Sequence, residues 1–287
     1  MKELHETKRC GLFKEIAEST WNRIIEAHEV GVDLPEIGIT ADILVKILQF
    51  SKSTLPNFDV FAKKGWNEKI YGSDIDVFVE VGSGLFVWFA LQAKVLKKEN
   101  RYTTLRDTSD TVMQWEKLVL LESRTGCKGY YLLYNGLKSF RFLGQDCCPI
   151  PFDQSQFGCS LVEPAVIKHF AERKKGKRYV NPSFEDIHPD YAEPWRVLVC
   201  CKQRNPERTL YLLKEILESN PTFFQLGAEF LKKEQSVDES TDKASEKEIP
   251  IVPNNRINAA CLEAGWNPSF RIIIRTTESA KKISFGI

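Results

Sequence analysis

Two neighbouring stretches decide the fold of this chain: Tyr71-Gly-Ser-Asp-Ile-Asp-Val-Phe-Val-Glu80 and, after a glycine-containing turn, Phe89-Ala-Leu-Gln-Ala-Lys94. Each is mostly apolar, as expected for strands of a buried sheet. Because side chains alternate between the two faces of a strand, the two aspartates of the first stretch share a face, and so do Gln92 and Lys94 of the second. The pattern predicts a β-hairpin that carries acidic, amide and basic groups.

Whether these polar side chains meet depends on the turn between the strands. A connection of residues 81–85 pairs Glu80 with Phe86 and places Asp74 opposite Gln92. A strict two-residue turn shifts the register by one residue and puts the polar pairs on opposite faces. The two glycines of the turn permit the wider or bulged connection that a shared site requires.

The polar residues of the hairpin have two interpretations. Gln92 and Lys94 interrupt an apolar run, so they need buried partners, and a structural polar pairing would supply them. The interpretation that we favour is a site for phosphodiester hydrolysis. Magnesium binds a few oxygen ligands, such as those of Asp74, Asp76 and Gln92, and a nearby cation stabilises the reacting oxygens.

The aspartate, the hairpin and the Gln-x-Lys tripeptide resemble the PD-(D/E)xK, or restriction-endonuclease-like, nuclease superfamily, in the variant with Gln that Mrr-like restriction enzymes carry. The sequence is similar in more detail to an uncharacterised bacterial family. The matching stretches are Glu36-Ile-Gly-Ile-Thr-Ala-Asp42, Gly72-Ser-Asp-Ile-Asp76, Gln92-Ala-Lys94, Gln114-Trp-Glu-Lys-Leu118 and Tyr131-Leu-Leu-Tyr-Asn135. The resemblance covers residues 34–136 and implies an α/β (α+β) fold, with a restriction-endonuclease-like core in which helices flank a central mixed sheet, followed by a C-terminal α/β extension.

The resemblance also implies roles for the hairpin residues. Asp74 matches the metal-binding aspartate, with Asp76 as its acidic companion. Gln92 replaces a second metal-binding carboxylate, and Lys94 matches the catalytic lysine. The implied cofactor is Mg²⁺ or Mn²⁺. Since an amide oxygen carries no formal charge, Gln92 neutralises less of the metal charge, and it leaves open a slow site, a site that depends on a partner, and an inactive site.

Further site residues follow from the same resemblance. The superfamily has an acidic residue on an early helix, and Glu36 is its best match; the weaker matches are Glu15, Glu18 and Glu26. The candidate substrate contacts are Gln114, Tyr134 and Asn135. An exposed helix position is the alternative for Gln114, and core packing is the favoured alternative for Tyr131 and Tyr134.

The expected function is therefore a magnesium-dependent endonuclease that cleaves DNA rather than RNA, with restriction or antiphage defence as its biological context. The alternative is an inactive nuclease-fold protein that binds nucleic acid or a partner protein. The sequence leaves a homodimer open. The basic run 168–178 is a candidate for phosphate contacts, with a solvated loop or helix end as its alternative.

Composition limits these expectations. The net charge is +1, and no apolar run is long enough to span a membrane. The eight cysteines lack metal-site spacing, so we expect neither a metal site nor a disulfide but buried thiols, in a cytoplasmic protein. We expect a nuclease-like core in residues 1–136, a continuation or accessory region in 137–234, a flexible linker or loop in 235–257 and a terminal strand segment in 258–287.

Periodicity and capping residues give the expected elements. The expected helices are 12–30, 40–50 with Thr40 as N-cap, 111–123, 159–173 after Pro164, and 209–219. The expected strands are 58–62, 69–81, 85–96, 129–134, 195–201 and 270–275.

Overall fold

The computed structural model describes most of the chain, with gaps. The described residues are 2–53, 58–63, 74–82, 84–106, 112–144, 152–200, 209–219, 223–226 and 256–275. The predicted linker is centred on residues that lie outside this set. Within the described residues, no helix is both long and apolar enough to cross a membrane.

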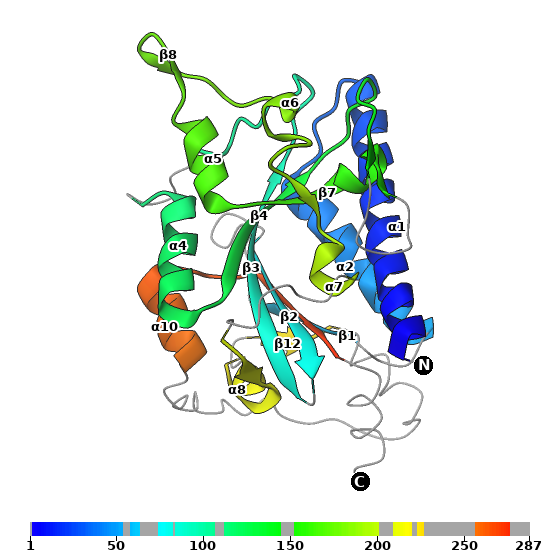
Figure 1. Cartoon of the computed structure of the whole chain (residues 1–287), viewed down its shortest axis with the longest axis vertical. Coiled ribbons are helices and arrows are strands. Elements are labelled where there is room, and N and C mark those ends of the chain that lie inside the picture. The colour runs from blue at the N-terminus through cyan, green and yellow to red at the C-terminus, as the bar shows by residue number, and fades with distance from the viewer. Residues whose placement is uncertain are drawn as a thin grey trace, which may run out of the picture.

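A mixed nine-stranded sheet forms the centre of the molecule (Figure 1). Its main path runs in the order β10-β7-β4-β3-β2-β13-β1-β12, and β11 pairs with β3 off this path. The strands are β1 (Phe58–Lys63), β2 (Ile75–Gly82), β3 (Leu85–Val95), β4 (Lys128–Tyr134), β7 (Cys159–Val162), β10 (Glu193–Pro194), β11 (Tyr211–Leu212), β12 (Phe223–Gln225) and β13 (Phe270–Ile274). The C-terminal strand β13 lies inside the sheet, parallel to β2 and antiparallel to β1.

Helices cover both faces of the sheet, which confirms the predicted α+β class (Figure 1). On one face lie α1 (Lys2–Glu29), α2 (Glu36–Ser53) and the short α7 (Val197–Cys200). On the other lie α4 (Gln114–Thr125), α5 (Pro164–Ala171), α6 (Phe184–Ile187), α8 (Leu213–Glu218) and α10 (Arg256–Ala264). The remaining elements are the 3-10 helix η1 (Gln154–Gly158), the hairpin β5 (Leu143–Gly144) with β6 (Phe152–Asp153), and the hairpin β8 (Lys174–Lys175) with β9 (Arg178–Tyr179).

The hairpin of β2 and β3 has the register that the wider turn predicts. Glu80 pairs with Phe86, and a β-bulge between Glu80 and Gly82 accommodates the extra residue. Gly84 closes the turn with a positive φ of 78°, and its N–H donates to the Glu80 carboxylate over 2.8 Å. The same register places Asp74, the residue before β2, opposite Gln92.

One predicted element is wrong, and several predicted boundaries differ from the structure. Helix α2 begins at Glu36, one turn before the predicted N-cap Thr40, whose hydroxyl instead donates to the Glu36 carbonyl within the helix. The predicted strand 195–201 is the short helix α7, because a short apolar run does not by itself distinguish a strand from a buried helical turn. Helix α5 begins at Pro164 as predicted, with strand β7 before it, whereas the predicted helix 209–219 begins with strand β11.

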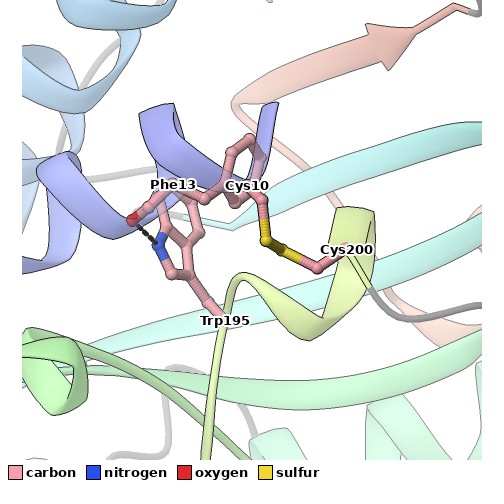
Figure 2. The surroundings of a disulfide bond; sticks show 4 residues. All are labelled: Cys10, Phe13, Trp195 and Cys200. Carbon is pink, nitrogen blue, oxygen red and sulfur yellow. Dashed lines mark hydrogen bonds between the residues drawn. A yellow bond between two sulfur atoms is a disulfide. The ribbon is translucent and has the colours of Figure 1, made fainter. Parts of the chain in front are cut away.

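The prediction that no cysteines are paired is also wrong. Cys10 of α1 and Cys200 of α7 form a disulfide across 190 residues of sequence (Figure 2). Beside it, the Trp195 ring packs on Phe13 and its Nε1 donates to the Phe13 carbonyl over 2.8 Å. The disulfide and the Trp195 contacts therefore attach α7 to helix α1. The described cysteines outside this disulfide, Cys127, Cys159 and Cys261, are all buried as predicted.

Candidate active site

The candidate site lies where β3 and β4 end and β2 begins. Strands β3 and β4 are parallel and pair Gln92 with Tyr131, while β2 runs antiparallel to β3. The carboxyl ends of parallel strands are the usual position of a site in an open α/β sheet, because the connections diverge there. The helices α2 and α4 both start near this edge, so their first residues can add side chains to it.

Asp74 and Gln92 are in direct contact at this edge. The Gln92 amide donates a hydrogen bond to the Asp74 carboxylate, and the Lys94 ammonium acts on the same carboxylate electrostatically. The Asp74 carbonyl accepts the N–H of Ser269 over 2.9 Å, which fixes its backbone to the start of β13. Both side chains are buried, Gln92 at 3% and Lys94 at 5% exposed. Because both act on Asp74, the structure brings together the amide and ammonium groups that the sequence predicts.

Burial and charges of both signs act on the Asp74 carboxylate, with the Lys94 and Lys117 ammoniums opposing Glu36. Burial raises the pKa of Asp74 from 3.8 to about 7; Lys94 lowers it, and the Glu36 carboxylate raises it further. Two carboxylates that act on one another in a desolvated place repel each other when both are ionised. A divalent ion between them removes that repulsion, and oxygen ligands of this kind are those that Mg²⁺ accepts.

Glu36 is the acidic residue that the helix contributes. It is the first residue of α2, and its Oε2 lies 3.9 Å from the Lys94 ammonium. The alternatives on α1 are elsewhere: Glu15 and Glu26 are exposed, and Glu18 pairs with Lys14. Because α2 starts earlier than predicted, Glu36 lies on the helix itself and is held by it.

Asp76 is not available to the same cation. Both of its oxygens are occupied: Oδ2 accepts from Nη2 and Nε of Arg271 at 2.7 and 3.2 Å, and Oδ1 accepts from the indoles of Trp88 and Trp266 at 3.0 and 2.9 Å. The side chain is fully buried. We therefore correct the predicted metal-ligand role of Asp76, which holds β2, β3 and β13 together instead.

Tyr131 lies at the candidate site, although core packing was the expected role for it. Its side chain is fully buried, and its hydroxyl has no hydrogen-bond partner within the described residues. Burial raises its pKa, and the charges of Asp74 and Glu36 raise it further, which places the hydroxyl close to both carboxylates. The signal in the sequence is a hydroxyl in an apolar strand next to Gln92, and an unpaired buried donor of this kind is costly unless a ligand satisfies it.

Gln114 remains a candidate substrate contact, whereas the other two do not. Gln114 is the first residue of α4, and its Oε1 is buried without a partner among the described residues. The Tyr134 hydroxyl instead bonds Thr40 at 2.9 Å inside the core. Asn135 is fully buried, accepts from Tyr102 at 2.6 Å and donates to the Phe157 carbonyl at 2.8 Å. We correct the predicted substrate roles of Tyr134 and Asn135 to internal hydrogen bonding.

The ligand set fits a hard divalent ion better than a thiolate-binding one. No group of three or more His, Cys, Asp or Glu side chains gathers anywhere in the described ranges. The set is two carboxylates, from Asp74 and Glu36, with the amide oxygen of Gln92. Magnesium keeps several waters and accepts one or two carboxylates together with neutral oxygens, so these groups are of the chemical kind that it binds.

Comparison with known proteins gives a family match only. The chain matches the model of a family described as "Family of unknown function (DUF6615)" over residues 9–279. That range includes all the site residues. No curated protein and no solved structure matches the chain.

Proposed function

Since the chain belongs to the family of unknown function DUF6615, we propose its function from the site: a divalent-metal-dependent nuclease that hydrolyses phosphodiester bonds of DNA. The observation that carries the proposal is the convergence of the Asp74 and Glu36 carboxylates, the Gln92 amide and the Lys94 ammonium at one edge of the sheet. The resemblance to the PD-(D/E)xK superfamily supports the same chemistry. Its association with restriction or antiphage defence is part of the proposal.

Asp74, Glu36 and the Gln92 oxygen would hold Mg²⁺ or Mn²⁺, which when bound neutralises phosphate charge and makes water more acidic. The chain's own groups supply positioning. Glu36 holds the Lys94 ammonium at 3.9 Å, and a buried ammonium donates strong hydrogen bonds to an attacking water or to the oxygen on which charge develops. The Tyr131 hydroxyl offers one further donor, to a phosphate oxygen. Burial of these groups keeps them oriented before the substrate arrives.

One observation favours a second function, nucleic-acid binding without cleavage. Gln92 is neutral at a position where the superfamily has a carboxylate, so two formal negative charges instead of three face the cation. The fold and the binding surface would be retained in such a protein. The cleavage assay below separates the two functions.

The test is cleavage of supercoiled plasmid by the purified full chain with Mg²⁺ or Mn²⁺, and with EDTA as the metal-free control. We expect Asp74→Asn and Lys94→Ala each to lose activity by roughly 100-fold or more. The matched controls are Asp190→Asn and Lys98→Ala, which alter an exposed carboxylate and an exposed ammonium. Equal activity in the site variants and the controls contradicts the nuclease; plasmid binding without cleavage in every sample identifies the silent alternative.

A further inference from the structure

The hairpin of β8 and β9, residues 174–179, is here called the basic ribbon. Every one of its residues is exposed. It carries Lys174, Lys175, Lys177 and Arg178 and no acidic residue, and in Figure 1 it projects from the body of the molecule beyond α5. Gly176 forms its turn with a φ of 65°.

Within the part of the chain that the structure describes, no carboxylate neutralises the charges of the basic ribbon. Lys175 and Arg178 are directly paired across the two strands, an arrangement that places like charges opposite one another and is destabilising. Among the described residues, no carboxylate forms an ion pair with any of the four basic side chains, and the nearby Asp186 pairs instead with Arg173. An anion bound at the ribbon removes this repulsion.

The basic ribbon is braced rather than loose. The Tyr179 ring lies between two cations, with the Arg106 guanidinium 3.4 Å from its centroid and the Lys174 ammonium 4.6 Å from it. Just past the ribbon, Arg101 Nη1 donates to the Asn181 carbonyl over 2.6 Å. Arg101 and Arg106 belong to the segment that follows β3, the strand of Gln92 and Lys94. The ribbon is thus fixed to the continuation of the strand that carries the site.

The ribbon and the site also share one end of the sheet. The start of β3 pairs with β11, beside α8, since Phe86 is opposite Tyr211. Strand β3 therefore runs away from α8 and towards the end of the molecule at which the ribbon projects (Figure 1). The site and the ribbon therefore lie towards the same end of the sheet (Figure 1).

We propose that the basic ribbon binds duplex DNA by entering its major groove and contacting the backbone phosphates. The proposal deepens the proposed function and rests on it for the choice of DNA. The major groove of B-form DNA admits a two-stranded β-ribbon, whereas the major groove of A-form RNA is too narrow for side chains to enter. The only aromatic ring of the ribbon, Tyr179, is engaged by Arg106, so the ribbon presents cations without apolar groups.

The test compares two full-chain variants that each lose three positive charges. The ribbon variant is Lys175→Gln/Lys177→Gln/Arg178→Gln; the control variant is Lys8→Gln/Arg124→Gln/Lys214→Gln, which alters exposed cations on α1, α4 and α8. Binding to a labelled DNA duplex is measured by fluorescence anisotropy in EDTA, from about 50 to about 200 mM salt. We expect the slope of log affinity against log salt concentration to correspond to about two to three fewer phosphate contacts in the ribbon variant than in the wild type. Its affinity should be lower by roughly tenfold or more. The control variant should match the wild type.

Equal salt dependence in the ribbon and control variants overturns the proposal, and so does equal ribbon-dependent binding of an RNA duplex of the same length. A wild-type chain that does not bind DNA overturns it as well. If the wild type binds DNA through the ribbon but does not cleave it, the ribbon proposal is supported and the nuclease proposal is contradicted. If the wild type cleaves DNA but its binding does not depend on the ribbon, the nuclease proposal is supported and the ribbon proposal is contradicted. Because the ribbon variant removes the like-charge pair, we expect its melting temperature to equal or exceed that of the wild type. The single substitution Lys175→Gln serves as a second binding test with a smaller expected change.

Discussion

The Arg271 guanidinium lies 2.7 Å from the Asp76 carboxylate, although 195 residues separate the two in the sequence. Both side chains are fully buried, and Arg271 also donates to the Ser219 hydroxyl over 2.6 Å. The pair joins the C-terminal strand β13 to β2, directly beside Asp74. Asp74 therefore lies at the candidate cation site, whereas Asp76 holds together the strands that position Asp74.

This division of roles predicts different effects of two similar substitutions. Arg271→Met leaves the Asp76 charge buried without its partner, and we expect it to cost about 3–5 kcal/mol in the free energy of unfolding. Asp76→Asn leaves Arg271 unpaired and has a comparable cost. Asp74→Asn removes a charge that burial disfavours and leaves stability unchanged or higher. Urea unfolding in EDTA measures all three variants, and a destabilisation by Asp74→Asn as large as that of Asp76→Asn contradicts the assignment.

His188 predicts a loss of stability in acid. It is fully desolvated: its Nδ1 donates to the Phe184 carbonyl at 3.2 Å, so its Nε2 accepts from the Ser160 hydroxyl at 2.8 Å in the neutral ring. Burial lowers its pKa from 6.5 to about 3. Below pH 6.5 the His188 imidazole therefore binds a proton in the unfolded chain but not in the folded one. As the pH decreases from about 6.5 to about 3, the free energy of unfolding decreases by up to about 1.4 kcal/mol per pH unit.

The measurement is the free energy of unfolding as a function of pH for the wild type, His188→Gln and the exposed-site control His169→Gln. We expect His188→Gln to have the shallower slope between about pH 4 and about pH 6.5, whatever its absolute stability. His169→Gln retains the wild-type slope. A His188→Gln curve parallel to that of the wild type disproves the buried neutral imidazole.

Local patterns predicted the hairpin because its information is local. Two apolar runs on either side of a glycine-containing turn indicated both strands of the hairpin, and the register needed only one choice, which the bulge beside Gly82 makes. Asp74, Gln92, Lys94 and Glu36 are close together because consecutive elements meet at one edge. The proximity of groups on neighbouring elements could therefore be anticipated from the hairpin register, and that of Glu36 from the resemblance; their roles stay a prediction.

Long-range pairing could not be predicted in the same way. Nothing near β13 indicates that it inserts between β1 and β2, and nothing near Asp76 indicates that Arg271 will occupy it. The same holds for the Cys10–Cys200 disulfide. The start of α2 was missed for a local reason: Thr40 is a good N-cap by composition, but its hydroxyl bonds the Glu36 carbonyl and Tyr134 inside the core.

The disulfide predicts a redox-dependent stability. It closes a loop of 190 residues, so its reduction increases the entropy of the unfolded chain, with an expected cost of about 3–5 kcal/mol. Unfolding by guanidinium chloride with and without a reductant measures this difference. Cys200→Ser is expected to behave in both conditions as the reduced wild type does. A wild type that is equally stable with and without reductant shows that Cys10 and Cys200 are not bonded in solution.

Tyr131→Phe tests whether the site takes a ligand at all. The Tyr131 hydroxyl is buried, its pKa is raised by that burial and by the charges of Asp74 and Glu36, and it lacks a partner among the described residues. Removal of an unsatisfied buried hydroxyl relieves a desolvation cost of about 1–3 kcal/mol, so we expect Tyr131→Phe to unfold at the same or a higher urea concentration than the wild type. If the hydroxyl donates to a substrate phosphate, the same variant loses roughly tenfold or more in cleavage rate, with plasmid binding unchanged.

A matched variant shows what an ordinary buried tyrosine does. Tyr134 lies on the same strand, but its hydroxyl is satisfied by Thr40, so Tyr134→Phe leaves the Thr40 hydroxyl with one partner fewer. We expect Tyr134→Phe to lose about 1 kcal/mol of stability and to keep its cleavage rate, the reverse of Tyr131→Phe. Both variants are followed by urea unfolding and by single-turnover plasmid cleavage. If Tyr131→Phe is destabilised and fully active, its hydroxyl has a partner inside the protein, and Tyr131 belongs to the core rather than to the site.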